Sequence, residues 1–259
     1  MASKLFYLWR LFWTPVAFAA LGVGGLVLAW TVIPAATIFE RDEYKRNRTA
    51  QAIIRQSFRL YLWCLQTVGI IRLEVSGADQ FRDCHGKLVV ANHPTLLDIV
   101  ILMALLPDAK CVGKEQLWRN PMLRFVVSAA GYIRNDHEPE VFLAKCRETL
   151  AAGFNLIIFP EGTRTVPGRP LHFQRGFAHI ALASEVDLLP VFITCEPITL
   201  VKGEPFYKVP AARPCFRIEA GNAVATASYT PNATGSRTLD ARALVSQIEA
   251  DYYRKLSHG

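Results

Sequence analysis

A long apolar stretch near the N-terminus is the strongest feature of the hydrophobic pattern. Residues 11–39 carry no formal charge over 29 consecutive positions and are rich in Leu, Val, Ala, Phe and Trp. A helix of this length would exceed the hydrocarbon core of a bilayer, which is roughly 30 Å thick, whereas two full spans would need about 40 residues. The stretch therefore predicts either one tilted transmembrane helix or a bent helix that enters a single leaflet. Pro15 and Pro34 are expected to mark its boundaries.

A basic and amphipathic segment follows the apolar stretch. Six basic residues lie within positions 41–59, against two before residue 11, and such an excess favours a cytoplasmic location for the downstream side. Four apolar residues recur at helical spacing: Ile54, Phe58, Tyr61 and Leu65. This amphipathic helix could pack its apolar face against a protein core, but its place directly after the apolar stretch favours the headgroup layer of a membrane. We predict that residues 1–68 form an N-terminal membrane anchor.

From about residue 70 onward, short apolar strands alternate with helical patterns. The predicted strands cover residues 70–75, 87–91, 155–159 and 189–193. The predicted helices cover residues 96–106, 122–130, 141–153, 177–184 and 239–254. Alternation of this kind predicts an α/β sandwich, here over residues 69–259.

Composition and charge narrow the range of partners. The chain is 51% hydrophobic and has a net charge of +7, which suits an anionic partner such as nucleic acid, anionic lipid or an acidic carrier protein. No nucleic-acid recognition motif accompanies the charge, and a membrane anchor disfavours nucleic acid. The six cysteines are widely spaced and form no CxxC pair or Cys/His cluster. Neither a zinc site nor a disulfide framework is predicted, and free thiols in a reducing compartment are expected.

The segment from Asn92 to Asp98 joins a predicted strand to a predicted helix. His93 would lie at the carboxyl end of the strand, where α/β sheets usually place their chemistry. Asp98 would fall in the first helical turn, close enough to accept a hydrogen bond from the imidazole. That contact would select one tautomer, leave the other ring nitrogen free as a base, and stabilise the imidazolium. Taken alone, the spacing also fits a polar helix start with a capping aspartate.

A second polar turn follows another predicted strand. It reads F-P-E-G-T-R, from Phe159 to Arg164. Gly162 permits close backbone approach, Thr163 offers a hydroxyl, and Arg164 provides a planar fork suited to phosphate. Glu161 could hold a substrate hydroxyl or orient the arginine. The alternative interpretation is a salt-bridged surface turn.

The two turns, in this order, resemble the motifs of the glycerolipid acyltransferase family, which includes the enzymes that acylate 1-acylglycerol 3-phosphate. The block from His93 to Asp98 is similar to the family's H-x4-D motif, and residues 159–164 are similar to its F-P-E-G-T-R motif. Two further blocks are similar to the family's: the lysine-containing stretch at 113–117 with Asn120-Pro121, and the strand-like block at 189–193. The resemblance implies a mixed-sheet sandwich and makes residues 69–259 an acyltransferase catalytic domain.

One block departs from the family pattern. The family's second motif usually reads glycine, hydrophobic residues and then Asp-Arg, whereas this chain has G-Y-I-R-N-D-H from Gly131 to His137. Arg134 stands where an apolar residue is usual, and His137 stands near the expected arginine. Arg134 could contact the acceptor phosphate from a shifted register, or it could be an ordinary solvent-facing arginine.

The resemblance implies transfer of a fatty acyl group from acyl-CoA or acyl carrier protein to the hydroxyl of a lysophospholipid. The simplest acceptor is 1-acyl-sn-glycerol 3-phosphate, which would give phosphatidic acid. His93, positioned by Asp98, would deprotonate the hydroxyl. The residues implied to bind substrate are Thr95, Lys114, Arg134, Glu161, Gly162, Thr163 and Arg164. No metal is expected, and no cofactor beyond the thioester co-substrate.

The expected setting is a membrane, with the catalytic domain on the cytoplasmic face of the bacterial inner membrane and anionic lipid as a further partner. The acceptor could instead be another lysolipid, such as one containing an amino acid. A thioesterase or lipid hydrolase would use water at the same base, although the chain has no G-x-S-x-G motif for a serine route. A lipid-binding or membrane-shaping module would need no base at all.

Overall fold

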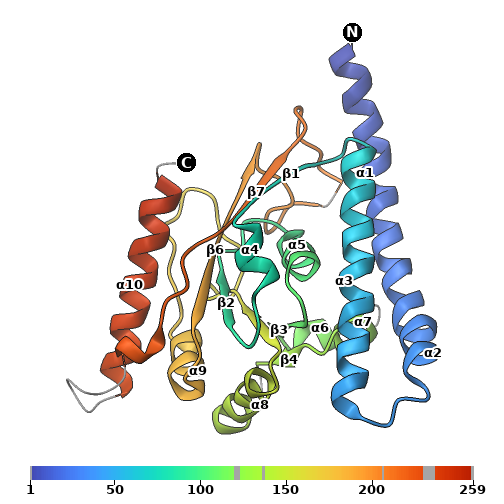
Figure 1. The fold of residues 1–259 in the computed structure, drawn as a ribbon. Helices are drawn as coiled ribbons and strands as arrows, with labels where there is room; N and C mark the ends of the chain where they lie inside the picture. The colour runs from blue at the N-terminus through green and yellow to red at the C-terminus, as the bar shows by residue number, and fades with distance from the viewer. Residues whose placement is uncertain (1, 120–122, 136–137, 206, 230–236, 258–259) are drawn as a thin grey trace.

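The computed structural model describes residues 2–119, 123–135, 138–205, 207–229 and 237–257. These residues form one sheet of seven strands in the order β1-β7-β6-β2-β5-β3-β4 (Figure 1). The strands are β1 (Arg72–Ser76), β2 (Leu88–Ala91), β3 (Ala109–Gly113), β4 (Ile133–Arg134), β5 (Asn155–Ile158), β6 (Leu188–Glu196) and β7 (Cys215–Ala220). β6 and β7 pair antiparallel, and the other neighbouring strands pair parallel. The predicted mixed α/β sheet is confirmed.

Helices cover both faces of this sheet (Figure 1). Before the sheet come α1 (Ala2–Val27), the π-helical segment η1 (Leu28–Val32), α2 (Ile33–Thr37) and α3 (Glu43–Thr67). Between the strands lie α4 (Ala78–Arg82), α5 (Asp98–Leu105), α6 (Gln116–Arg119), α7 (Leu123–Ala129), α8 (Pro139–Ala151) and α9 (Gly176–Ser184). After β7 come the 3₁₀ turn η2 (Thr226–Tyr229) and α10 (Arg237–Ser257).

Alternate residues of the central strands point to opposite faces of the sheet. In β2, Val89 and Ala91 join the core that includes α3 and α5, whereas Leu88 and Val90 join the core that includes α8, α9 and α10. All four residues are buried. A strand covered on both faces reads as a continuous apolar run, which explains why the sequence pattern predicts β2 and β5 correctly.

The sequence pattern misses several elements, namely α4, α6, β3, β4 and β7. β7 carried a usable signal, because Phe216 and Ile218 are buried while Arg217 between them is exposed. Such alternation is typical of a strand with one solvated face. The other predicted strands and helices all form the expected element in the described residues, with small shifts at the ends, and Met122 of the predicted helix 122–130 lies outside those residues.

The N-terminal helix does not end at its prolines, so the prediction that they mark its boundaries is wrong. The helix that begins at Ala2 continues through Pro15 and Pro34 to Thr37. Just before Pro34 it widens into η1, where the backbone N–H of Ile33 bonds to the carbonyl of Leu28, five residues back. A π-helical turn of this kind accommodates a missing donor and the proline ring within a continuing helix.

The apolar face of α3 packs against the protein core. Ile54 and Leu65 are buried, and Phe58 and Tyr61 pack against the same cluster as α5. The expected place of this face in the headgroup layer is therefore wrong, and the alternative of a core-facing helix is confirmed. The reason is that α5 is apolar all round and needs cover on its outer side. The domain boundary after residue 68 stays a prediction.

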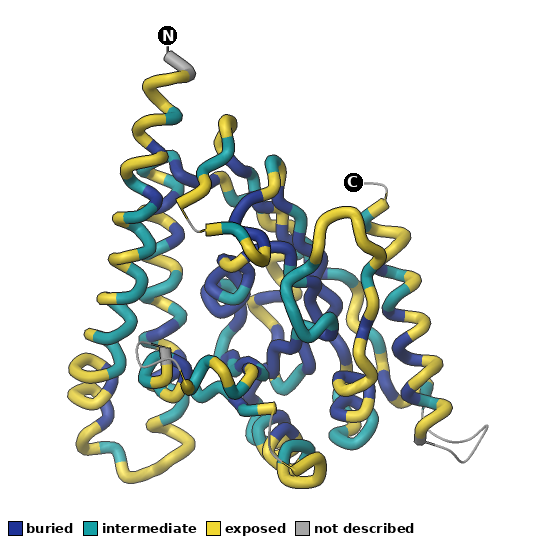
Figure 2. Tube along the Cα trace, turned by 180° about the vertical axis from the view of Figure 1, so that it is seen from behind, coloured by how far each residue is buried: buried dark blue, intermediate teal, exposed yellow. Residues whose placement is uncertain are grey.

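α1 and α3 form an antiparallel pair along one side of the molecule (Figure 1). Near one end Trp9 Nε1 donates to the carbonyl of Val68 at 2.8 Å, and further along Tyr61 Oη donates to the carbonyl of Ala17 at 3.3 Å. Among the described residues one helical stretch, Lys4–Thr37, has the length and apolar composition of a membrane span. Figure 2 shows its outward side as largely exposed.

Candidate active site

His93 and Asp98 are brought into contact at the carboxyl end of β2. His93 Nδ1 lies 2.8 Å from Asp98 Oδ2, and Asp98 is fully buried. The aspartate does not cap α5, since its carboxylate instead accepts from the backbone N–H of Thr95 at 2.7 Å and from Thr95 Oγ1 at 2.5 Å. With Nδ1 engaged, Nε2 is the nitrogen that can take up a proton, and no described residue hydrogen-bonds to it.

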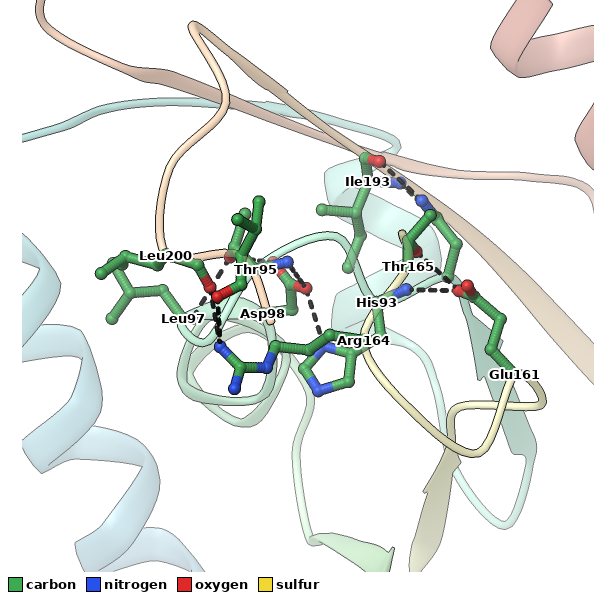
Figure 3. Close-up of polar contacts among 11 residues, drawn as sticks. His93, Thr95, Leu97, Asp98, Glu161, Arg164, Thr165, Ile193 and Leu200 are labelled. Carbon is green, nitrogen blue, oxygen red and sulfur yellow. Dashed lines mark hydrogen bonds and ion pairs between the residues drawn. The ribbon is translucent and has the colours of Figure 1, made fainter. Parts of the chain in front are cut away.

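The second turn contacts both the ring and the backbone of His93 (Figure 3). The imidazole stacks on the ring of Phe159, with centroids 4.1 Å apart. The backbone N–H of His93 donates to Glu161 Oε1 at 2.9 Å, and its carbonyl accepts from the backbone N–H of Thr165 at 2.7 Å. Thr165 Oγ1 donates to the same carboxylate oxygen at 2.8 Å. The two motifs that are separate in the sequence thus form one site.

Glu161 contacts the backbone of His93, and no described contact joins it to Arg164. Burial raises the pKa of the Glu161 carboxyl, and the hydrogen bond from the His93 backbone partly offsets this shift. The geometry is that of a group that holds the base in place. The expectation that Glu161 orients the arginine finds no support in the contacts of the described residues.

Arg164 is anchored by part of its guanidinium. Nη1 donates to the carbonyls of Leu200 at 2.9 Å and Val201 at 3.1 Å. Leu200 has φ +56°, a left-handed conformation that is uncommon for a leucine. Nε and Nη2 have no acceptor among the described residues, and Figure 3 places the side chain beside His93. Two nitrogens of the Arg164 guanidinium can therefore donate hydrogen bonds to an anion that binds beside the imidazole.

The other residues predicted to bind substrate lie in different surroundings. Thr95 is fully buried against Asp98, which makes it a support for the carboxylate. Gly162 has φ +64°, and Thr163 beside it is half-buried. Lys114 is exposed directly after β3. It follows Gly113, the partner of Arg134 in the register of β3 and β4.

Arg134 itself faces Glu115 and Trp118. Its Nη2 lies 3.8 Å from Glu115 Oε1, and its guanidinium carbon lies 5.6 Å from the centre of the Trp118 ring. No described contact joins Arg134 or Lys114 to His93. Asn120, Pro121, Asp136 and His137 lie outside the described residues.

Two residues that support the site were not predicted from the sequence. The buried side chain of Asn92 donates to the carbonyl of Ile193 and accepts from its backbone N–H, each at 2.8 Å. Tyr252 Oη lies 2.7 Å from the carbonyl of Val90 and accepts from the backbone N–H of Val191 at 3.1 Å. The role of Asn92 could have been predicted, because a polar asparagine directly follows the apolar strand β2. Nothing in the polar pattern of α10 pointed to the second.

Both side chains bond to backbone groups of β6 that face β2. Tyr252 Oη lies between the carbonyl of Val90 and the backbone N–H of Val191. Asn92 bonds through its side chain to the backbone of Ile193, two residues further along β6. They hold the end of β2 directly before His93.

Among the described residues, no group of three or more His, Cys, Asp or Glu side chains could hold a metal ion. The site thus consists of a histidine base, a buried carboxylate and an arginine fork. It is suited to proton transfer beside a bound anion.

Comparison with known proteins places this site in a family. The family model described as Acyltransferase matches residues 72–194, which contain both turns. Residues 72–194 thus form an acyltransferase domain that carries the two motifs of the glycerolipid acyltransferases. The motifs at 93–98 and 159–164 are the ones that form the site.

Curated relatives share the middle of the chain. It is 30% identical over 157 residues to the 1-acyl-sn-glycerol-3-phosphate acyltransferase of Cocos nucifera, covering 58% of this chain and 49% of that protein. It is 31% identical over 177 residues to the human 1-acyl-sn-glycerol-3-phosphate acyltransferase alpha, covering 65% of this chain and 59% of that protein. The chain spans about half the length of the curated relatives it matches.

A solved structure shares the fold. The 1-acyl-sn-glycerophosphate (LPA) acyltransferase PlsC from Thermotoga maritima superposes with a TM-score of 0.72 over 98% of this chain and 97% of that one. The sequence identity is 19%. The agreement extends over the N-terminal helices as well as the sheet.

Proposed function

We propose that the chain transfers a fatty acyl group from an acyl thioester to the free hydroxyl of 1-acyl-sn-glycerol 3-phosphate, giving phosphatidic acid. The observation that carries this proposal is the contact of His93 Nδ1 with the buried Asp98 at 2.8 Å, directly beside the free donors of Arg164. A base and an anion-binding fork at one strand end suit an acceptor with both a hydroxyl and a phosphate. The names of the curated relatives agree with this acceptor.

In the proposed reaction, His93 Nε2 takes the proton from the glycerol hydroxyl as its oxygen attacks the thioester carbonyl. The tetrahedral intermediate then collapses, the C–S bond breaks, and the imidazolium returns the proton to the departing thiolate. Asp98 stabilises the imidazolium between the two steps. Such acid–base catalysis contributes roughly 10²–10⁴-fold in rate.

Direct attack by the acceptor is favoured over an acyl-enzyme. Burial raises the pKa of the Cys195 thiol to about 12, and the charge of Asp98 contributes to this shift. A thiol that stays protonated at neutral pH is a poor nucleophile. The hydroxyl of the acceptor can therefore reach the thioester without a covalent intermediate on the protein.

Substrate contacts follow from the positions of the polar groups. Arg164 would bind the acceptor phosphate through Nε and Nη2, and Thr163 lies in the same turn. Lys114 directly follows β3, and Arg134 is the last residue of β4. The carboxyl ends of these parallel strands lie at the same edge of the sheet as that of β2. They would contact phosphate groups of the acceptor or the donor.

We further propose that the enzyme works at a membrane, with the catalytic domain on the cytoplasmic face of the bacterial inner membrane. The apolar helix α1–α2 lies alongside α3, whose other face packs on the catalytic core. Because this helix packs along the side of the domain, it is better suited to lie in one leaflet of the membrane. A helix that crosses the whole bilayer would have to extend beyond the domain. The donor would be acyl-CoA or acyl carrier protein, and no further cofactor is proposed.

The proposal is tested by incubating the purified full chain with a panel of lysolipids and with both donor types. We expect radiolabelled phosphatidic acid from 1-acyl-sn-glycerol 3-phosphate, with little free fatty acid. Preferential acylation of an amino-acid-containing lysolipid would instead assign another acceptor. Release of free fatty acid without an acylated product would identify a hydrolase and refute the transfer.

A further inference from the structure

Buried polar atoms without partners gather on the inner side of α1. Arg10 is 5% exposed and Thr14 is 7% exposed. Yet Arg10 Nε and Nη1, Trp13 Nε1 and Thr14 Oγ1 have no hydrogen-bond partner among the described residues. Residues at these spacings share one side of a helix. Buried polar groups in folded proteins are nearly always hydrogen-bonded. Of these residues Arg10 lines a large cavity, so its two unpartnered nitrogens indicate a place for a polar ligand there.

Arg10 faces a second arginine across a cavity of about 550 Å³. Arg10 Nη2 donates to the carbonyl of Ala211 at 2.5 Å, and Arg213 Nε donates to the carbonyl of Ile71 at 2.8 Å. Arg213 Nη2 donates to the carbonyls of Gln66, at 2.8 Å, and of Ile71, so Nη1 is the nitrogen of Arg213 without an acceptor among the described residues. Burial lowers the pKa of the Arg10 guanidinium, and the positive charge of Arg213 lowers it further. No carboxylate of the described residues forms an ion pair with either arginine. An anion in the cavity would relieve this repulsion.

The walls of the cavity include apolar side chains that are exposed to the surroundings. Leu5 is 70% exposed, Phe6 68% and Trp9 48%, and all three line the same cavity as Arg10. They continue the outward apolar side of α1. A site with buried positive charge and an apolar rim suits an amphiphile with an anionic head.

The cavity is separate from the candidate active site. Thr14 lines a much smaller space of about 30 Å³, whose other walls include Leu97 and Leu200. Leu200 is the residue whose carbonyl holds Arg164. This smaller space is too small for a lipid headgroup, and none of the residues that line the large cavity belongs to the candidate active site, which supports two distinct sites.

We propose that the cavity between Arg10 and Arg213 binds the phosphate group of an anionic phospholipid, separately from the acyl acceptor. Arginine forks match phosphate oxygens in geometry and charge. The apolar rim would contact the glycerol and the start of the acyl chains. This binding does not depend on the proposed acyl transfer, because none of these groups touches His93.

The test follows thermal unfolding of the purified full chain in detergent while short-chain ligands are added. Dihexanoyl phosphatidylglycerol is expected to raise the Tm in a saturable manner. Dihexanoyl phosphatidylcholine is expected to raise it far less, because its choline is repelled by the arginines. Inorganic phosphate is expected to act only at much higher concentration, since it lacks the apolar part. An equal response to phosphatidylcholine or to inorganic phosphate would overturn the assignment of an anionic lipid.

Substitutions locate the binding. Arg10→Met should raise the apparent Kd for phosphatidylglycerol by about tenfold or more, as expected for loss of a charged donor. The control Arg59→Met removes an equal charge from the exposed surface of α3 and should leave the Kd unchanged. If Arg10→Met does not fold, Arg10→Lys keeps the charge without the fork and should still bind several-fold more weakly.

Binding at the candidate active site would give the opposite pattern. Phosphatidylglycerol affinity would then be lost in Arg164→Met and retained in Arg10→Met or Arg10→Lys. That result would overturn the proposed site while leaving the acyltransferase proposal intact.

Discussion

His93 is held on four sides by groups from two turns. Asp98 engages Nδ1, Phe159 supports the ring, Glu161 accepts from the backbone N–H, and Thr165 donates to the carbonyl. Each contact restricts a different movement of the residue. A base held this way needs little reorganisation when the reaction begins.

Replacement of the imidazole is the most direct test of the base. His93→Ala should lower kcat by roughly 10²–10⁴-fold, because proton transfer from the hydroxyl is lost. Phosphatidic acid formation by purified protein measures this effect. The control His179→Ala removes an exposed histidine on α9 and should leave kcat unchanged. Near-normal turnover in His93→Ala would mean that another group is the base.

The backbone conformation at Gly162 also belongs to the residue scale. A Cβ at this position would lie 2.7 Å from Gln174 Nε2, and the φ of +64° is itself costly for alanine. Gly168→Ala meets a similar φ of +78° with nothing within 4 Å, so it isolates the backbone cost. Each variant should lose about 1–2 kcal/mol of unfolding free energy from the left-handed backbone.

Only Gly162→Ala should also lower kcat, because displacement of Gln174 disturbs the turn that holds His93. Denaturant unfolding and steady-state kinetics on both variants separate the two effects. Equal kcat in the two variants would show that the turn tolerates the shift.

At the scale of elements, α10 reaches through one face of the sheet to support the strand that bears the base. Tyr252 is fully buried, and its hydroxyl lies between the carbonyl of Val90 in β2 and the backbone N–H of Val191 in β6. Strand pairing at this point therefore depends on a side chain from the far end of the sequence. Through this hydrogen bonding, α10 helps to fix the end of β2, which directly precedes His93.

Tyr252→Phe should lower the unfolding free energy by about 1–3 kcal/mol, because it leaves buried backbone groups without a partner. It should also reduce kcat more than it changes the acceptor KM, since the end of β2 is released. The matched control is Tyr253→Phe, whose exposed hydroxyl donates to the carbonyl of Leu171, and a change within about 0.5 kcal/mol is expected there. Similar losses in both variants would contradict a special role for Tyr252.

At the scale of the whole molecule, the two sides of the sheet differ in what covers them. α9 and α10 cover one side with polar outer surfaces, whereas α3 and then α1 cover the other (Figure 1). The outward side of α1 presents apolar residues such as Phe12, which is 64% exposed, and Val23, which is 59% exposed. We infer that this side of the molecule faces the membrane.

Charges on that side should weaken membrane binding. Phe12→Glu with Val23→Glu should reduce vesicle binding at least about tenfold, because each burial of a large apolar side chain is worth roughly 1.5–3 kcal/mol. Flotation with phosphatidylglycerol vesicles measures the effect. The control Ala243→Glu with Ser246→Glu adds the same charge to exposed positions of α10. If both pairs reduce binding equally, net charge and not the α1 surface controls association.

The sequence by itself determined the features that depend on local patterns. The two-sided apolar runs predict β2 and β5, since a central strand is buried on both faces. The motifs from His93 to Asp98 and from Phe159 to Arg164 indicate the site and the family, because each is a short turn with a fixed spacing. The contact between His93 and Asp98 could be expected because five residues bridge one strand-to-helix corner.

The tertiary structure alone decided the features that depend on residues far apart in the chain. The apolar face of α3 packs against the core, because the apolar helix α5 has to be buried on its outer side. The N-terminal helix continues through Pro34 by way of a π-helical turn. In the folded chain Glu161 accepts a hydrogen bond from the backbone N–H of His93, and Tyr252 bonds to the backbone of β2. Amphipathic periodicity shows that a helix has an apolar face but not what that face contacts, and hydrogen bonds across long separations follow from packing alone.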